Sequence, residues 1–222
     1  VAVLDSGISQ HPDLKVIRRF NTISKKPGFD DHGHGTHVAG TIGALNNQFG
    51  VVGVGPKVKL YGVKVLDSEG TGYLSDLVEG IALCIQHRIR VINMSLGSAK
   101  GSTALHGIIK KAYKKGIVIV ASGGNYGVNA GQIDYPAKYK ETIAVAATTG
   151  NNKIANFSSR GHGLDVAAPG VNVLSTYLKG TYIRMSGTSM STPLVTGSAA
   201  LLLHRKPNLS PARVKELLQR TA

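Results

Sequence analysis

Short apolar runs alternate along the chain with longer segments whose apolar residues recur at helical spacing. The runs stay apolar at consecutive positions, as parallel strands covered on both faces require. The pattern predicts strands at residues 1–4, 60–65, 91–94, 117–121, 143–147 and 164–167, and helices at 34–43, 74–87, 103–115, 189–204 and 210–219. This β-α-β alternation indicates an α/β fold, a three-layer, doubly wound and mostly parallel sheet with helices on both faces.

Two of the expected helices carry clear boundary signals. One begins after Gly101-Ser102 and ends at Lys114-Lys115-Gly116, so a capping residue precedes it and a glycine follows it. The other begins at Ser210-Pro211, with proline at the first helical position. No repeat, low-complexity stretch or linker interrupts the pattern, so residues 1–222 are expected to form one domain.

Composition narrows the class of protein. The 222 residues are 42% hydrophobic and 17% charged, which suits one sizeable folded core. The single cysteine, Cys84, excludes an internal disulfide framework, and its apolar neighbours predict a buried side chain. No apolar run approaches the roughly 20 residues of a membrane span, and no signal peptide is present. The chain starts without Met inside an apolar strand, so we expect a trimmed or partial chain.

The net charge is the most unusual feature of the composition. Lys and Arg total 26 against 12 Asp and Glu, which gives a net charge of +14. This excess suggests an anionic partner such as nucleic acid or a membrane surface, or adaptation to alkaline surroundings. The basic residues are spread along the chain, and no helix-turn-helix, zinc-finger or RNA-binding signature accompanies them. Neither nucleic acid nor a membrane is therefore expected as a partner.

Three motifs lie where such a sheet binds its ligands, beyond the carboxyl ends of strands. Asp5 ends the first strand and is either a turn residue or a carboxylate that orients an imidazole. His32, His34 and His37 follow at close spacing, which admits a zinc site, although no carboxylate or Cys ligand has a recognised spacing. We expect His37 to be a general base presented from the first helical turn, and His34 to have a packing role.

The third motif joins a strand to a helix of small residues at Ser189. A serine at a helix start is usually a cap. Here the backbone N–H groups and the helix dipole would also stabilise the oxyanion formed when Ser189 attacks a carbonyl group.

Taken in chain order, Asp, His and Ser, these motifs resemble those of the subtilisin-family (subtilase, peptidase S8) serine endopeptidases. The resemblance covers essentially the whole chain, which would then be a single peptidase catalytic domain. Asp5-Ser6-Gly7 is more similar to bacterial subtilisins than to the kexin and furin branch. The matching stretches are residues 5–7, 34–41, 91–97, 121–127 and 187–193. A catalytically silent, subtilase-shaped binding module is the alternative.

The resemblance implies a role for each matched residue. Ser189 would be the nucleophile, His37 the base, Asp5 the orienting carboxylate, and the Asn125 amide an oxyanion donor. An extended polypeptide substrate would pair with two backbone edges. The implied substrate-binding residues are Gly70, Thr71, Gly72, Leu74, Ser95, Leu96, Gly97, Ser122, Gly123 and Asp134, with Tyr73 beside Leu74.

Residues 128–134 should close the floor of the first specificity pocket. Asp134 takes a place where the family often has a small residue, and we expect its carboxylate to favour Lys or Arg before the scissile bond. The alternative is that this carboxylate turns to solvent or accepts a backbone N–H.

The resemblance also implies a structural calcium ion. Its ligands would be the Asp13 carboxylate, Asn47 and the carbonyls of Leu45, Phe49 and Val51, an oxygen set that suits Ca²⁺. In the family, a segment that would precede Val1 supplies a further ligand, and we expect the site to be weak without it. A secreted monomer that folds with the help of its own pro-segment completes the implied picture.

Overall fold

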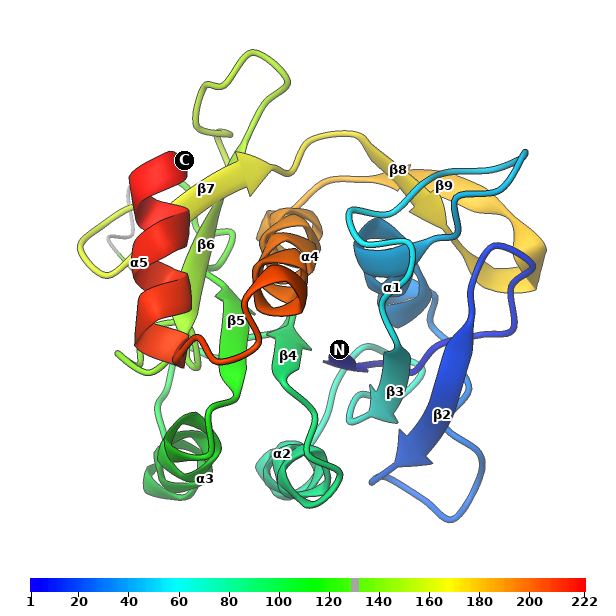
Figure 1. Ribbon diagram of the computed structural model, residues 1–222, viewed down its shortest axis with the longest axis horizontal. Helices are drawn as coiled ribbons and strands as arrows, with labels where there is room; N and C mark the ends of the chain where they lie inside the picture. The colour runs from blue at the N-terminus through cyan, green and yellow to red at the C-terminus, as the bar shows by residue number, and fades with distance from the viewer. Residues whose placement is uncertain (129–131) are drawn as a thin grey trace.

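The computed structural model describes residues 1–128 and 132–222. Seven parallel strands form one sheet in the order β2-β3-β1-β4-β5-β6-β7 (Figure 1). They are β1 (Ala2–Asp5), β2 (Val16–Asn21), β3 (Leu60–Lys64), β4 (Val91–Met94), β5 (Val118–Ser122), β6 (Ile143–Thr148) and β7 (Val166–Pro169). A separate antiparallel pair consists of β8 (Val173–Thr176) and β9 (Tyr182–Met185).

Helices cover both faces of this sheet. They are α1 (His34–Gly43), α2 (Leu74–Gln86), α3 (Thr103–Lys114), α4 (Thr188–Arg205) and α5 (Pro211–Thr221). One buried cluster joins α2 and α3 to the strands, including Ile81, Cys84 and Ile109. Two further clusters hold α1, α4 and α5 against the other face. The α/β expectation and the burial of Cys84 are confirmed.

The boundaries of the expected elements are close but not identical. The strand expected at 164–167 is shifted by two residues: β7 begins at Val166, and Asp165 before it accepts the Ala144 N–H with its carboxylate. The sequence pattern also missed β2 and the β8–β9 pair. β2 is an edge strand with exposed Ile17 and Arg18, so it lacks the continuous apolar run of a central strand.

The strand order reverses beside β1, which lies between β3 and β4. Crevices at such a reversal, beyond the carboxyl ends of the strands, are the usual ligand sites of this architecture. Asp5 is the last residue of β1 and therefore lies at that crevice. In the described part of the chain, the helices are too short or too polar to cross a bilayer.

Candidate active site

The imidazole that contacts Asp5 is that of His34. The His34 Nδ1 atom lies 2.7 Å from Asp5 Oδ1, and the Asp5 side chain is fully buried. An ionised carboxylate can only accept, so Nδ1 carries the proton and Nε2 is left as the basic nitrogen. Burial alone would lower the pKa of His34, but the charge and hydrogen bond of Asp5, with the charge of Asp30, raise it above 6.5.

The expectation that His37 is the general base is wrong. Its side chain is fully buried, and its Nε2 donates to the Val173 carbonyl at 3.0 Å. Burial also lowers the pKa of His37 to about 4, despite that hydrogen bond. A neutral imidazole enclosed in this way cannot exchange a proton with a substrate. His37 instead attaches α1 to β8.

Gly35 explains how His34 comes so close to Asp5. A Cβ atom at Gly35 would lie 2.1 Å from the Gly7 carbonyl oxygen and 3.1 Å from the Asp5 Cβ. The start of α1 can therefore pack against the end of β1 only if residue 35 has no side chain.

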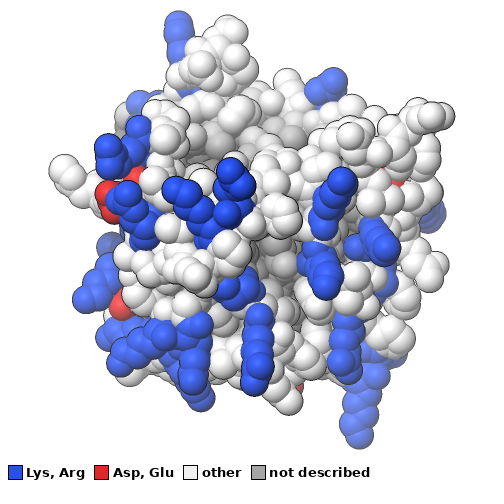
Figure 2. Space-filling model, in the orientation of Figure 1, with Lys and Arg blue, Asp and Glu red and all other residues white. Residues whose placement is uncertain are grey.

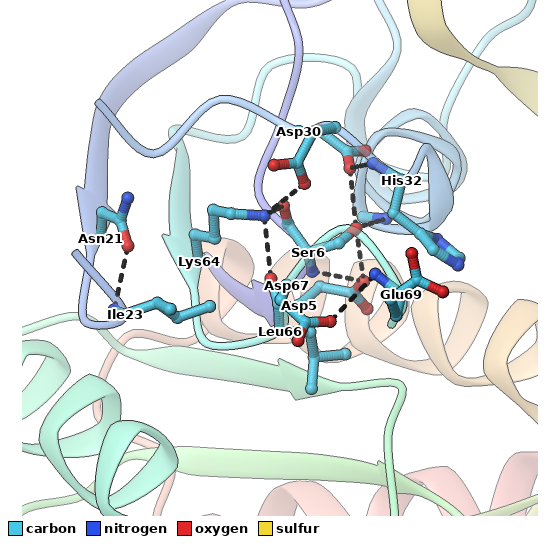
Figure 3. A network of polar contacts seen from close by, with 12 residues as sticks. Asp5, Ser6, Asn21, Ile23, Asp30, His32, Lys64, Leu66, Asp67 and Glu69 are labelled. Atoms are coloured by element: carbon cyan, nitrogen blue, oxygen red, sulfur yellow. Dashed lines mark hydrogen bonds and ion pairs between the residues drawn. The ribbon is translucent and has the colours of Figure 1, made fainter. Parts of the chain in front are cut away.

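A buried carboxylate fixes the same helix start. Asp30 Oδ1 accepts the backbone N–H groups of His32 and Gly33, and Oδ2 accepts the N–H and hydroxyl of Thr36, at 2.6–3.0 Å. The Ser6 hydroxyl donates to Asp30 at 2.8 Å, which links the end of β1 to this turn (Figure 3). Asp30 was not among the residues predicted from the sequence, although it lies just before the histidine motif.

Lys64, at the end of β3, secures the residues around Asp5. Its ammonium group donates to the Ser6 carbonyl at 2.8 Å, the Leu66 carbonyl at 2.9 Å and Asp31 at 2.6 Å (Figure 3). All three N–H groups of the buried ammonium donate hydrogen bonds. These bonds offset the free-energy cost of removing the charge from water. A lone lysine in an otherwise apolar strand is the signal in the sequence that points to this role.

Ser189 lies in the first turn of α4, as expected. Its hydroxyl donates to the Ser95 carbonyl at 3.1 Å, and the Ser95 hydroxyl donates to the Ser189 carbonyl at 2.8 Å. Asn93 donates to the Ser95 hydroxyl at 3.0 Å and accepts from the Thr196 hydroxyl at 2.8 Å. This chain of hydrogen bonds ties Ser189 to the end of β4 and to the interior of α4.

Asn125 is held with its amide nitrogen free to donate. Its Oδ1 accepts both the backbone N–H and the hydroxyl of Thr188, each at 2.9 Å. The Nδ2 atom therefore points elsewhere, next to Gly187, where a Cβ atom would lie 3.5 Å from it. Since Thr188 directly precedes Ser189, this donor lies near Ser189, where the expected oxyanion donor would have to be.

A cleft of about 730 Å³ brings the two expected substrate edges together. One wall holds Gly70–Leu74 and the other Ser95–Gly97, with His32 and His34 also lining the space. This is the size of ligand sites in general. Tyr73 stands 80% exposed at the rim.

Asp134, Ser122 and Gly123 lie behind the second edge and do not line that cleft. The Asp134 N–H donates to the Gly123 carbonyl, and its Oδ1 accepts the Tyr126 hydroxyl at 3.0 Å. Its Oδ2 lies within 3 Å of where Cβ atoms on Gly97 and Gly124 would be. Of the expected pocket floor at 128–134, residues 129–131 lie outside the described residues.

The expected calcium ligands come together in a second place. Asp13 accepts from the Asn47 amide at 2.9 Å and from the Val51 N–H at 3.0 Å, so the 45–51 loop wraps its carboxylate. A Cβ atom at Gly50 would lie 2.4 Å from Asp13 Oδ2. Within the ranges that the structure describes, no three His, Cys, Asp or Glu side chains gather as a metal site. Asp13 carries the one carboxylate among the expected ligands, so carbonyl and amide oxygens would supply the other contacts, a set that Ca²⁺ accepts.

Comparison with known proteins agrees with this geometry. Residues 1–222 match the subtilase family of S8 peptidases. The chain is 46% identical over 223 residues to a thermostable alkaline protease of Halalkalibacterium halodurans, covering 100% of this chain and 61% of that protein. It is 50% identical over 226 residues to subtilisin DY of Bacillus licheniformis, covering 100% and 82%.

The fold itself is also shared with a solved structure. A cold adapted subtilisin-like serine proteinase superposes with a TM-score of 0.92 at 33% identity, covering 100% of this chain and 81% of that one. The chain spans only 60–61% of the length of several relatives that it matches.

Proposed function

The chain belongs to the subtilase family, and we propose that it is a serine endopeptidase that hydrolyses proteins through an acyl-enzyme on Ser189. Two contacts carry the proposal. His34, which lines the cleft, is hydrogen-bonded to buried Asp5. Ser95, which lines the same cleft, accepts the Ser189 hydroxyl with its carbonyl. A silent binding module would have no need of this arrangement.

The resting hydroxyl of Ser189 must turn before it can react. It donates to the Ser95 carbonyl at 3.1 Å, and rotation about its side-chain bonds redirects the proton toward Nε2 of His34. His34 takes this proton as Ser189 attacks the scissile carbonyl, and Asp5 stabilises the imidazolium that forms. His34 then returns the proton to the leaving amine.

The developing oxyanion would be stabilised by two donors. Asn125 Nδ2 is one, because Thr188 holds the amide oxygen on the other side. The backbone N–H of Ser189, at the start of α4, is the other. These donors are fixed before the reaction, so they need no reorganisation when the charge appears.

Hydrolysis of a chromogenic peptide that is sensitive to phenylmethylsulfonyl fluoride tests this function. The proposal predicts steady turnover that the inhibitor stops completely. A folded protein that binds the peptide without cleaving it would instead establish the binding module.

We further propose that Asp134 favours Lys or Arg before the scissile bond. Its Oδ1 is engaged by Tyr126, whereas Oδ2 lies close to Gly97 and Gly124, whose backbones would flank the expected specificity pocket. A cationic side chain reaching that oxygen would form a charge-assisted hydrogen bond.

Replacing Asp134 by Asn removes the charge at nearly constant shape. We expect the ratio of kcat/KM for Lys-ended over Phe-ended peptides to fall about tenfold, since a charged hydrogen bond contributes about 1.4 kcal/mol or more. Tyr126→Phe is the matched control, because it frees the carboxylate without removing it and should not lower the ratio. A ratio unchanged by Asp134→Asn contradicts the assignment.

The Lys preference should also depend on pH. Burial raises the pKa of Asp134, although the hydrogen bond from Tyr126 opposes the shift. A raised pKa means that the carboxylate is protonated at a higher pH than usual, so the Lys preference should weaken on acidification before other carboxylates titrate. The same pH series on Asp134→Asn should be flat.

A calcium ion bound by Asp13, Asn47 and the carbonyls of Leu45, Phe49 and Val51 is also proposed. The ion would stabilise the 45–51 loop against Asp13 and would take no part in peptide cleavage. At a calcium concentration about 100-fold above Kd, binding to the native state adds about 2.7 kcal/mol.

That stabilisation should raise Tm by about 5 °C or more in a chain of this size. Calcium titration of thermal unfolding measures it, with Mg²⁺ as the comparison ion. Asp13→Asn should abolish the rise. If calcium leaves Tm unchanged, the site does not work in this chain.

The remaining proposals follow from the likeness to bacterial subtilisins. Polypeptides are the substrates, and the peptidase acts outside the cell as a monomer. A pro-segment assists its folding.

A further inference from the structure

Eleven of the 26 Lys and Arg residues lie at one end of the sheet. All seven strands are parallel, so their amino ends lie along one edge, opposite the cleft. Five of the connections that lead into these strands carry exposed Lys or Arg residues, and so does the end of α4. We call this set the basic belt: Lys15, Lys57, Lys59, Arg88, Arg90, Lys114, Lys115, Lys138, Lys140, Arg205 and Lys206.

Acidic residues do not neutralise the belt. In the same connections, Asp13 is fully buried, and Glu141 contacts His106 at 3.0 Å. Asp165 is paired with Lys215 at 2.7 Å. The sequence from Gly80 to Ile133 contains no Asp or Glu at all. Figure 2 shows Lys and Arg spread over the visible face, over α3 and around the α4–α5 connection, with only small areas of Asp and Glu.

Around β4, β5 and the α4–α5 segment, the cations of the belt share one surface. Arg90, before β4, donates to the Pro207 carbonyl at 3.0 Å, which joins that connection to the α4–α5 segment. A groove of about 550 Å³ lies there, lined by Arg90, Lys114, Lys115 and residues 207–211. From β2 to β6 the sheet order has five steps, and at about 4.8 Å per step the belt extends roughly 24 Å.

The surface chemistry indicates which polyanion fits. Protein interfaces have apolar and aromatic residues at their core. No exposed large hydrophobic residue of the described chain lies within 86–90, 113–117, 138–142 or 205–211, although Ile17 and Val52 are exposed in the segments that carry Lys15 and Lys57. The cations lie on separate loops and helix ends. A flexible polymer can bend to contact many of them, whereas a stiff DNA duplex contacts only a few at a time.

We propose that the basic belt binds a linear anionic polysaccharide and holds the protein on it with the cleft facing away. Cations on at least five connections would each release counterions from the polymer, which makes the binding strongly dependent on salt. Because the belt and the cleft lie at opposite ends of the strands, the bound polymer leaves the cleft open to peptides.

Dextran sulfate, with neutral dextran as the reference, is the probe. Binding is measured by titration calorimetry at several salt concentrations on protein with Ser189→Ala, which prevents self-cleavage. In the belt variant, Gln replaces Lys114, Lys115, Lys140 and Lys206. The control variant loses the same charge elsewhere, with Gln at Lys25, Lys26, Lys153 and Lys179, all exposed and outside the belt.

The belt variant should bind at least tenfold more weakly at 0.1 M salt, because about one counterion fewer is released for each lost cation. Its plot of log Kd against log salt should be shallower by about 3. The control variant should change less than threefold. Equal losses in both variants, or no binding beyond that of neutral dextran, overturn the proposal.

Two further arms test the partner and the orientation. A 20-base-pair DNA duplex at equal charge concentration should bind more weakly than dextran sulfate, and tighter duplex binding would assign the belt to nucleic acid instead. With Ser189 intact, saturating dextran sulfate should leave hydrolysis of a short neutral peptide unchanged within twofold. Strong inhibition would show that the polymer occupies the cleft.

Discussion

His34→Ala is expected to lower kcat by about 10⁶-fold, the magnitude known for loss of the base in subtilisin itself. His34 is the histidine in contact with Asp5, and its Nε2 is the basic nitrogen open to the cleft. Without it the Ser189 proton has no acceptor. Activity that survives comes from the oxyanion donors and substrate binding alone.

The matched control is His37→Gln, three residues along the same helix. Glutamine keeps a donor for the Val173 carbonyl, so the main effect should be a loss of stability of about 1–3 kcal/mol. We expect its kcat to stay within about tenfold of the unsubstituted protein. Peptide hydrolysis measures both variants, and circular dichroism shows that each is folded. A folded His34→Ala protein that keeps its activity would remove His34 from the mechanism.

Asp5→Asn is expected to lower kcat by about 10⁴-fold, again the magnitude known from subtilisin. The amide cannot stabilise the imidazolium, and it presents a donor where Nδ1–H needs an acceptor. Asp5 Oδ2 is buried without a partner among the described groups, so an amide nitrogen there would be left unsatisfied. Some loss of stability should accompany the loss of rate.

The pH profile separates this electrostatic role from a structural one. Burial opposes the shift, but Asp5 raises the pKa of His34 above 6.5. Catalysis needs the neutral imidazole, so kcat/KM should fall as the pH drops through this raised pKa. In Asp5→Asn the residual activity should persist to lower pH. An acid limb at the same pH in both proteins would contradict the pairing.

The pattern of apolar runs predicted the central strands and the helices, because central parallel strands are buried on both faces. It failed at β2 and at the β8–β9 pair, where the strands are half exposed. Pairing between such strands depends on distant partners, and local hydrophobicity does not show them.

The site was predicted less completely for a specific reason. His34 and His37 are three residues apart on α1, and both belong to the same motif. Spacing alone does not say which ring turns toward Asp5 and which toward β8. The absence of a side chain at Gly35 decides it in the folded chain, together with the four hydrogen bonds that Asp30 makes to the helix start. The motifs and their order in the sequence identified Asp5, Ser189 and Asn125 as candidates. Asp30 and Lys64 act through contacts between distant segments, which the motifs do not show.

The most direct test of the proposed arrangement is the site of reaction with a sulfonyl fluoride, located by mass spectrometry in three proteins. The account predicts a single adduct on Ser189 in the unsubstituted protein and in His37→Gln, and no adduct on the same time scale in His34→Ala. Rapid labelling of Ser189 in folded His34→Ala, or its absence in folded His37→Gln, would contradict the assignment of His34 as the base.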